Sequence, residues 1–122
     1  QYFLIKNYLK NKYKTSIIPC KTIRNKNKIA LSSRNNHLDL NGIKKASVLS
    51  KSLIKFKKNL ANSKKIKQNL KIQMKYFEKF LKIKIEYLEL RSIKNLKISN
   101  TVRGSRLFIA YYIDKVRLID NF

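Results

Sequence analysis

The chain has 122 residues, enough for one domain with a small core, and its 30 Lys+Arg against 6 Asp+Glu give a formal net charge of +24. Such a globule repels itself, so the composition predicts a polyanionic partner, either nucleic acid or an acidic membrane surface. The longest apolar run, LFIAYYI at 107–113, is far short of the roughly 20 residues of a spanning helix, which excludes membrane insertion.

The first 40 residues are expected to form a short helix and then a basic extended arm. Apolar side chains recur at helical spacing between residues 3 and 13. Periodicity is lost from Thr15 to Leu40, which contain the only proline, Pro19, and clusters of Ser and Asn. Basic arms of this kind become ordered on RNA, and a disordered linker is the alternative. The RNA contacts predicted in this arm are Arg24, Lys26, Lys28 and Arg34.

Residues 41–61 are predicted to form a helix. Their apolar side chains recur at steps of three and four, and Asn41 or Asp39 can cap the start. Lysines occupy another face and are predicted to contact RNA phosphates: Lys44, Lys51, Lys55 and Lys58.

Residues 63–95 are predicted to form a second helix, because two apolar stripes run through them at helical spacing. One stripe extends from Ile66 to Leu88 and the other from Tyr76 to Leu90. A helix that is apolar on two sides is expected between two partners, so 41–61 and 63–95 are predicted to pack as a helical hairpin. The remaining face carries further predicted RNA contacts: Lys64, Lys67, Lys71 and Lys75.

The chain after residue 98 favours β structure. Short β-branched and aromatic runs are separated by turn signals at 100–105 and 114–115, which predicts a small β-hairpin or meander. A helix over 106–113 is the alternative. Arg103, Arg106 and Arg117 are predicted RNA contacts here. The fold class expected is therefore mainly α, a single domain made of an arm (1–40), a hairpin core (41–98) and a β extension (99–122).

Catalytic chemistry finds little support in the sequence. His37 is the only histidine and Cys20 the only cysteine, which argues against a metal site and an internal disulfide. The two glycines are too far apart for a phosphate loop. Glu86 and Glu89 are interpreted as ion-pair partners. The sequence predicts no enzyme, no catalytic or metal-binding residue, no cofactor and no small-molecule substrate.

Short stretches of the sequence resemble two families of ribosomal proteins. SKK at 63–65, FLK at 80–82 and IKNLKI at 93–98 are similar in type and spacing to the small-subunit ribosomal protein fifteen family, an α-helical family that binds an rRNA junction. This resemblance implies that Ser63, Lys64 and Lys65 contact RNA. Separately, NGIKKASV at 41–48 resembles a helix of large-subunit ribosomal protein twenty.

These features predict a structural protein of an organellar ribosome, which binds rRNA and neighbouring ribosomal proteins through Lys and Arg contacts to phosphates. Abundant Lys, Asn and Ile, with AT-rich codons, favour a mitochondrial matrix location, with another organelle or the cytoplasm of an AT-rich organism as alternatives. Two other hypotheses remain open. One is a basic accessory subunit of an organellar membrane complex, and the other is a DNA-binding or nucleoid protein.

Overall fold

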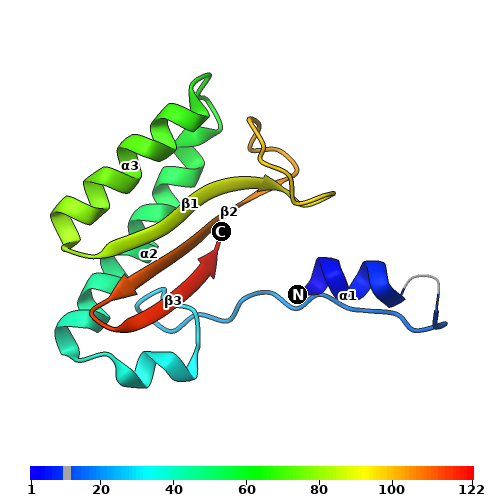
Figure 1. The fold of residues 1–122 in the computed structure, drawn as a ribbon, viewed down its shortest axis with the longest axis horizontal. Helices are drawn as coiled ribbons and strands as arrows, with labels where there is room; N and C mark the ends of the chain where they lie inside the picture. Colours follow the sequence, from blue (N-terminus) through cyan, green and yellow to red (C-terminus); the bar gives the residue numbers. More distant parts are fainter. Residues whose placement is uncertain (10–11) are drawn as a thin grey trace.

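A computed structural model describes residues 1–9 and 12–122 of the chain (Figure 1). Helices and strands occur in the following order within these residues: α1 (Tyr2–Leu9), the 3-10 helix η1 (Ser33–His37), α2 (Leu40–Leu60), α3 (Ile66–Leu81), β1 (Lys84–Ser92), β2 (Ser105–Ile113) and β3 (Val116–Asn121).

The strands form one antiparallel sheet in the order β1-β2-β3. Leu88 pairs with Ile109 and Leu90 with Leu107, so that the inward positions of β1 and β2 face each other in register. The β1–β2 register shifts between Ile85 and Tyr87, which is a bulge that bends β1 near its start.

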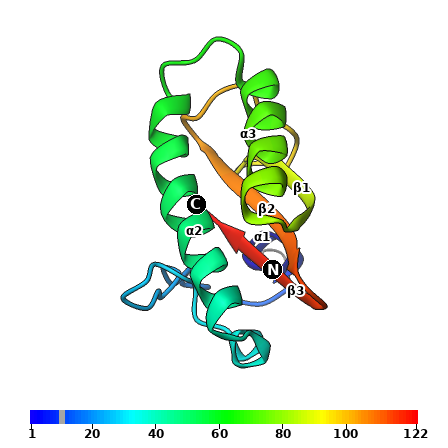
Figure 2. The ribbon, with the colours of Figure 1, turned by 90° about the vertical axis from the view of Figure 1, so that its left-hand side faces the viewer.

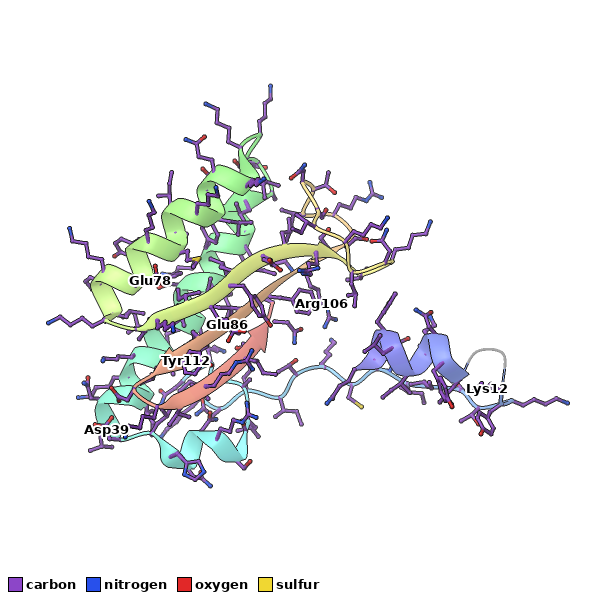
Figure 3. All side chains as sticks on the ribbon, in the orientation of Figure 1. Lys12, Asp39, Glu78, Glu86, Arg106 and Tyr112 are labelled. Atoms are coloured by element: carbon purple, nitrogen blue, oxygen red, sulfur yellow. The ribbon has the colours of Figure 1, made fainter. Side chains whose placement is uncertain are left out.

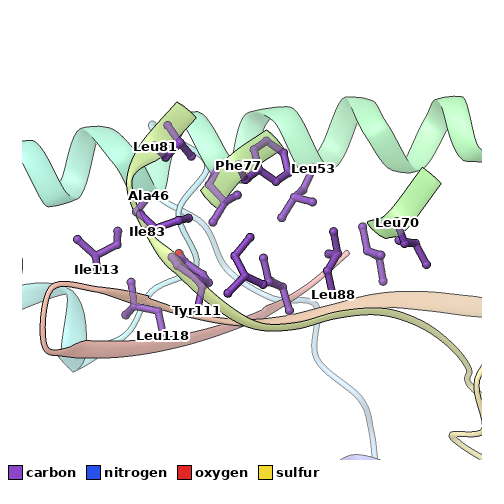
Figure 4. Packing of buried hydrophobic residues seen from close by; sticks show 14 of the residues in the cluster. Ala46, Leu53, Leu70, Phe77, Leu81, Ile83, Leu88, Tyr111, Ile113 and Leu118 are labelled. Atoms are coloured by element: carbon purple, nitrogen blue, oxygen red, sulfur yellow. The ribbon is translucent and has the colours of Figure 1, made fainter. Parts of the chain in front are cut away.

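α2 and α3 lie together over one face of this sheet (Figures 1 and 2). The core fills the space between the two layers, where Leu53 from α2 and Phe77 from α3 point toward the strands (Figure 4). The buried set continues through alternate residues of the strands, as expected for a sheet with one covered face. The helix-covered side of the sheet therefore forms the core of the protein.

Asp39 determines where α2 begins. Its Oδ1 accepts a hydrogen bond of 2.6 Å from the backbone N–H of Gly42, which leaves the Asp39 backbone extended and starts the helix at Leu40. Gly42 is buried beside Ile113, and an added Cβ there would lie 3.3 Å from the Ile113 Cγ2. The cap therefore fixes the start of α2 close to the β2–β3 hairpin.

Replacing Asp39 by alanine is expected to lower the free energy of unfolding by about 1 kcal/mol, because one N–H in the first turn loses its acceptor. Urea unfolding followed by circular dichroism measures this loss. Asp39→Asn keeps a capping oxygen and should cost much less. Equal losses in the two variants would contradict a capping role.

The predicted helix at 63–95 is wrong beyond Leu81. Lys82 adopts a left-handed backbone with φ 50°, which ends α3, and the chain continues as β1. Ile85 and Leu88 fit helical spacing from Leu81, but Ile83 and Ile85 also alternate with lysine at strand spacing. β-branched isoleucines pack well on a sheet, and here tertiary pairing with β2 decides the outcome.

The predicted fold class is therefore wrong. The chain is not mainly a helical hairpin, because in the described residues it combines three α-helices and a 3-10 helix with a three-stranded antiparallel sheet. The segment 106–113 is a strand, not the alternative helix, and it pairs with both of its neighbours. The β segments expected as a small separate hairpin are part of the central sheet.

α1 lies apart from the two-layered body, at the far end of an extended segment (Figure 1). None of its side chains is buried, although Leu4, Ile5 and Tyr8 are large and apolar. The helix expected near the start of the chain thus covers Tyr2–Leu9, and positions 10–11 of that stretch lie outside the described residues. Among the helices that the structure describes, none has the length and apolar character needed to cross a membrane.

Candidate functional site

Residues 24–37, here called the braced loop, fold against the edge of β3 instead of extending freely. A tight turn brings Arg24 and Ala30 into an antiparallel bridge, with Asn25 N–H donating to the Ile29 carbonyl at 3.0 Å. Asn25 Oδ1 accepts from the backbone N–H groups of Asn27 and Ile29 inside the turn. Lys28 has φ 68°, the left-handed conformation that this turn requires.

The braced loop is held to the body at several points. Arg24 forms two hydrogen bonds to the Asp120 carboxylate, at 2.7 and 2.9 Å, and a third to the Asn121 carbonyl at 2.9 Å. Ile29 is only 5% exposed and belongs to the core cluster. The Ser47 hydroxyl on α2 donates to the Asn27 carbonyl at 3.0 Å. The loop is therefore fixed to both the sheet and a helix.

The far half of the braced loop presents polar groups to solvent. Ser32, Ser33, Arg34 and His37 are exposed along η1. The backbone beneath them is ordered, since Asn35 donates to the Ala30 carbonyl at 2.9 Å and Ser32 Oγ accepts from the Arg34 N–H at 3.3 Å. Hydroxyl and guanidinium groups on a loop positioned by a rigid scaffold are the arrangement found in many binding sites.

A hollow of about 180 Å³ separates the braced loop from β2 and β3. Ser32, Arg34 and Asn35 line one side, and Tyr111 and Asp120 line the other. Burial, and then the nearby Asp120 carboxylate, raise the pKa of the Tyr111 phenol, so the hydroxyl stays protonated and can donate a hydrogen bond. The hollow can accept a small polar group, and it is too small for a whole nucleotide.

The structure distributes the predicted RNA contacts over separate surfaces. Arg24, Lys26, Lys28 and Arg34 lie in the braced loop, where Arg24 is used internally. Lys44, Lys51, Lys55 and Lys58 are exposed along α2. Arg117 on β3 forms an ion pair with Glu86 at 2.8 Å, on the sheet side that the helices leave open (Figure 3). The Arg117 guanidinium lowers the pKa of the Glu86 carboxyl.

Two hollows bring some of the predicted residues together. Lys64, Lys65, Lys67 and Lys71 line a hollow at the start of α3, and Lys75 lies further along that helix. Ser63 Oγ accepts from Asn69 Nδ2 at 2.8 Å, which gives this serine a structural partner. Arg24, Lys58 and Arg106 line a second hollow beside α2, whereas Arg103 lies outside all of these groups.

Sequence reasoning missed the serines and Asn35 of the braced loop. They follow the apolar stretch IAL at 29–31, and an apolar stretch directly before a polar quartet was the available signal in the sequence. Glu86 and Glu89 form ion pairs, with Arg117 and Arg91 as partners. No cluster of His, Cys, Asp or Glu suited to a metal ion occurs within residues 1–9 and 12–122.

The arrangement defines an α+β domain that carries an ordered polar loop on its sheet edge. Its fold resembles that of pantothenate synthetase from Thermus thermophilus, with a TM-score of 0.84 at 23% identity over 99% of this chain and 45% of the other. It also resembles pantoate-beta-alanine ligase from Francisella tularensis, complexed with beta-gamma ATP and beta-alanine, with a TM-score of 0.68 and 32% identity. That alignment covers 98% of this chain and 38% of the other.

Sequence relatives lead to the same family. The chain is 35% identical over 115 residues to the pantothenate synthetase of Flavobacterium psychrophilum, covering 92% of this chain and 40% of that protein. It is 41% identical over 109 residues to that of Clostridium acetobutylicum, covering 87% of this chain and 38% of the other. The pantoate-beta-alanine ligase family matches residues 1–122, and the chain belongs to this family. It spans about two fifths of the length of these curated relatives.

This membership overturns the functional predictions. The chain is not a ribosomal protein of either resembled family, and no rRNA-binding, DNA-binding or membrane-complex role is supported. The prediction of a non-enzyme is wrong, because the family consists of ligases. The expectation of no small-molecule substrate is also wrong, since the Francisella relative is complexed with a nucleotide and beta-alanine. Lysine-rich motifs of three to eight residues recur by chance in a chain with so many lysines.

Proposed function

We propose that this chain is part of an ATP-dependent ligase that joins pantoate to beta-alanine, and that the braced loop helps to bind the anionic groups of its substrates. The proposal rests on the family match over residues 1–122 and on the nucleotide and beta-alanine bound to the Francisella relative. Because the chain spans about two fifths of its relatives, the other elements of the active site are assigned to the rest of the protein.

The chemistry of the reaction explains what such a loop contributes. An amide bond must form between the amine of beta-alanine and the carboxyl of pantoate, and a free carboxylate is a poor electrophile. Cleavage of an ATP phosphoanhydride supplies the driving force when a carboxylate oxygen of pantoate bonds to phosphorus as the phosphoanhydride bond breaks. That oxygen then leaves with the phosphoryl group when the amine attacks the carbonyl carbon and loses a proton, and negative charge is redistributed over phosphate oxygens. Groups that are already positioned for that charge lower the barrier without reorganising.

Arg34 is the residue that best fits this role in the described chain. It is exposed on η1, next to the hydroxyls of Ser32 and Ser33, and its planar guanidinium suits the paired oxygens of phosphate and carboxylate. Its side chain has one internal partner, the Arg117 carbonyl at 3.2 Å, which leaves other N–H donors for a ligand. The proposal is carried by one observation. Arg34 is exposed to solvent, yet it lies on a loop that the hydrogen bonds of Arg24 hold in a fixed position.

Replacing Arg34 by glutamine in the ligase that contains this chain is expected to lower kcat/KM by about 10- to 100-fold, because a charge-assisted contact to substrate is lost. Formation of pantothenate from pantoate, beta-alanine and ATP gives the rate, with each substrate varied in turn. Arg34→Lys keeps the charge without the planar fork and should recover part of the loss.

Arg103→Gln is the matched control, since Arg103 is also exposed but lies outside the braced loop. This variant should retain nearly full activity, with a circular dichroism spectrum equal to that of Arg34→Gln. An Arg34→Gln ligase as active as the Arg103→Gln ligase would overturn the role of the loop.

A further inference from the structure

A second concave site, here called the cationic pocket, lies beside α2 on the other side of the Arg24–Asp120 ion pair. Its volume is about 590 Å³. The extended segment, α2, the start of β2 and the chain end after β3 all contribute to its walls. The lining residues are Lys21, Thr22, Arg24, Ile54, Lys57, Lys58, Ala61, Val102, Arg106, Asn121 and Phe122.

The charge of the cationic pocket is not neutralised by its own walls. Five lining residues are cations, and no Asp or Glu lines the pocket. Arg24 is committed to Asp120, and its guanidinium lies 4.5 Å from the centre of the Phe122 ring. Arg106 donates to the neutral Asn121 Oδ1 at 3.0 Å. In the part of the chain that the structure describes, Lys21, Lys57, Lys58 and Arg106 have no carboxylate within 4.0 Å.

Lys57 is a half-buried member of the cationic pocket. Its pKa is lowered, first by burial and then by repulsion from Arg106. Lysines in the last turn of α2 also face the negative end of the helix dipole, which favours them there. A bound anion would relieve the repulsion between Lys57 and Arg106.

We infer that the cationic pocket binds a polyanion of the phosphate type, such as a di- or triphosphate group, at a site distinct from the exposed half of the braced loop, residues 32–37. Four unpaired cations around one cavity exceed what a single carboxylate needs, and they match several negative charges. The side chains of Ile54, Val102 and Phe122 supply the apolar part of the wall, beside the cations. The volume accommodates a chain of linked phosphates.

The hollow at the start of α3 provides a comparison within the same molecule. It has a similar volume, about 590 Å³, and four lysines. These lysines all come from residues 64–71 of one continuous stretch, with no aromatic wall. The cationic pocket instead draws its cations from separate segments that the fold brings together, which fixes their spacing.

Calorimetric titration of the 122-residue chain with tripolyphosphate, orthophosphate and ATP tests this inference. The variant Lys57→Gln/Arg106→Gln is compared with Lys67→Gln/Lys71→Gln, and each has a net charge of +22 (+24 minus 2). We expect the first variant to bind tripolyphosphate at least about tenfold more weakly than the parent chain, because two charged contacts are lost. The second should stay within about threefold, as expected for a change in net charge alone.

Proton–nitrogen NMR locates the site, because tripolyphosphate should shift the amides of Val102 and Phe122. Equal binding of tripolyphosphate and ATP would identify the phosphate chain as the ligand, and tighter binding of ATP would identify a nucleotide. Equal weakening in the two double variants, or no saturable binding, would overturn the inference. The readout is independent of ligase activity, so the braced-loop proposal can fail without affecting this result.

Discussion

Phe77→Ala is expected to lower the free energy of unfolding by about 3–5 kcal/mol, because it removes a large aromatic side chain from a closely packed core. Phe77 is 1% exposed and lies between α3, α2 and the sheet, near Leu53 (Figure 4). The helices and the sheet both surround the Phe77 ring. Neither layer can move inward to fill the cavity left by Phe77→Ala without disturbing the other. Urea unfolding followed by circular dichroism and by tyrosine fluorescence measures the loss.

Phe80 supplies the matched control. It lies on the same helix three residues later, is 63% exposed, and stacks on Tyr76 with ring centres 5.5 Å apart. Phe80→Ala should cost less than about 1 kcal/mol, since an exposed aromatic pair contributes only part of that amount. Comparable losses for Phe77→Ala and Phe80→Ala would refute the placement of α3 on the sheet.

Asp120→Asn is expected to cost about 3 kcal/mol or more, because it leaves the Arg24 guanidinium without its counter-charge in a largely dry position. The two side chains are 17% and 4% exposed, and their contact joins residues 96 positions apart. The amide can still accept one hydrogen bond but cannot balance the charge. Thermal unfolding and amide exchange of residues 25–31 report the loss of stability and the release of the braced loop.

Glu86→Gln tests whether this loss is specific to the enclosed pair. Glu86 and Arg117 also form a close ion pair, at 2.8 Å, but their side chains are 40% and 38% exposed. Solvent screens such pairs, so Glu86→Gln should leave the unfolding midpoint nearly unchanged. If Asp120→Asn is equally harmless, Arg24 does not hold the loop in solution.

The sequence locates α2 to within one residue, because an amphipathic stripe and the Asp39 cap both act locally. It does not locate the boundary between α3 and β1, where Ile85 fits helical spacing from Leu81 and also fits strand spacing from Ile83. That ambiguity is resolved by hydrogen bonds to β2, about twenty residues further along the chain. When residues 84–92 are interpreted as helix, the first strand is missing from the prediction. The three-stranded sheet then cannot be predicted.

The candidate site escapes sequence reasoning for a different reason. Ser32 and Ser33 are typical turn residues, so nothing local distinguishes a functional loop from a linker. Long-range contacts, such as that of Arg24 with Asp120 and that of Ser47 with Asn27, show that the segment is ordered. The excess of lysine suggests RNA, yet charge determines solubility and attraction to anions in general, without specifying a nucleic acid. Here the family match, and not the charge, identifies the family to which the chain belongs.

The burial of the Ile29 side chain in the core limits how the braced loop can move. Because this one side chain is part of the core, the turn that carries it cannot open while the helices and the sheet stay closed. Loops on enzymes often open locally, at a small fraction of the global unfolding energy. In this chain the turn and the core should instead form one cooperative unit, so a substrate that contacts the loop stabilises the whole domain and not the loop alone.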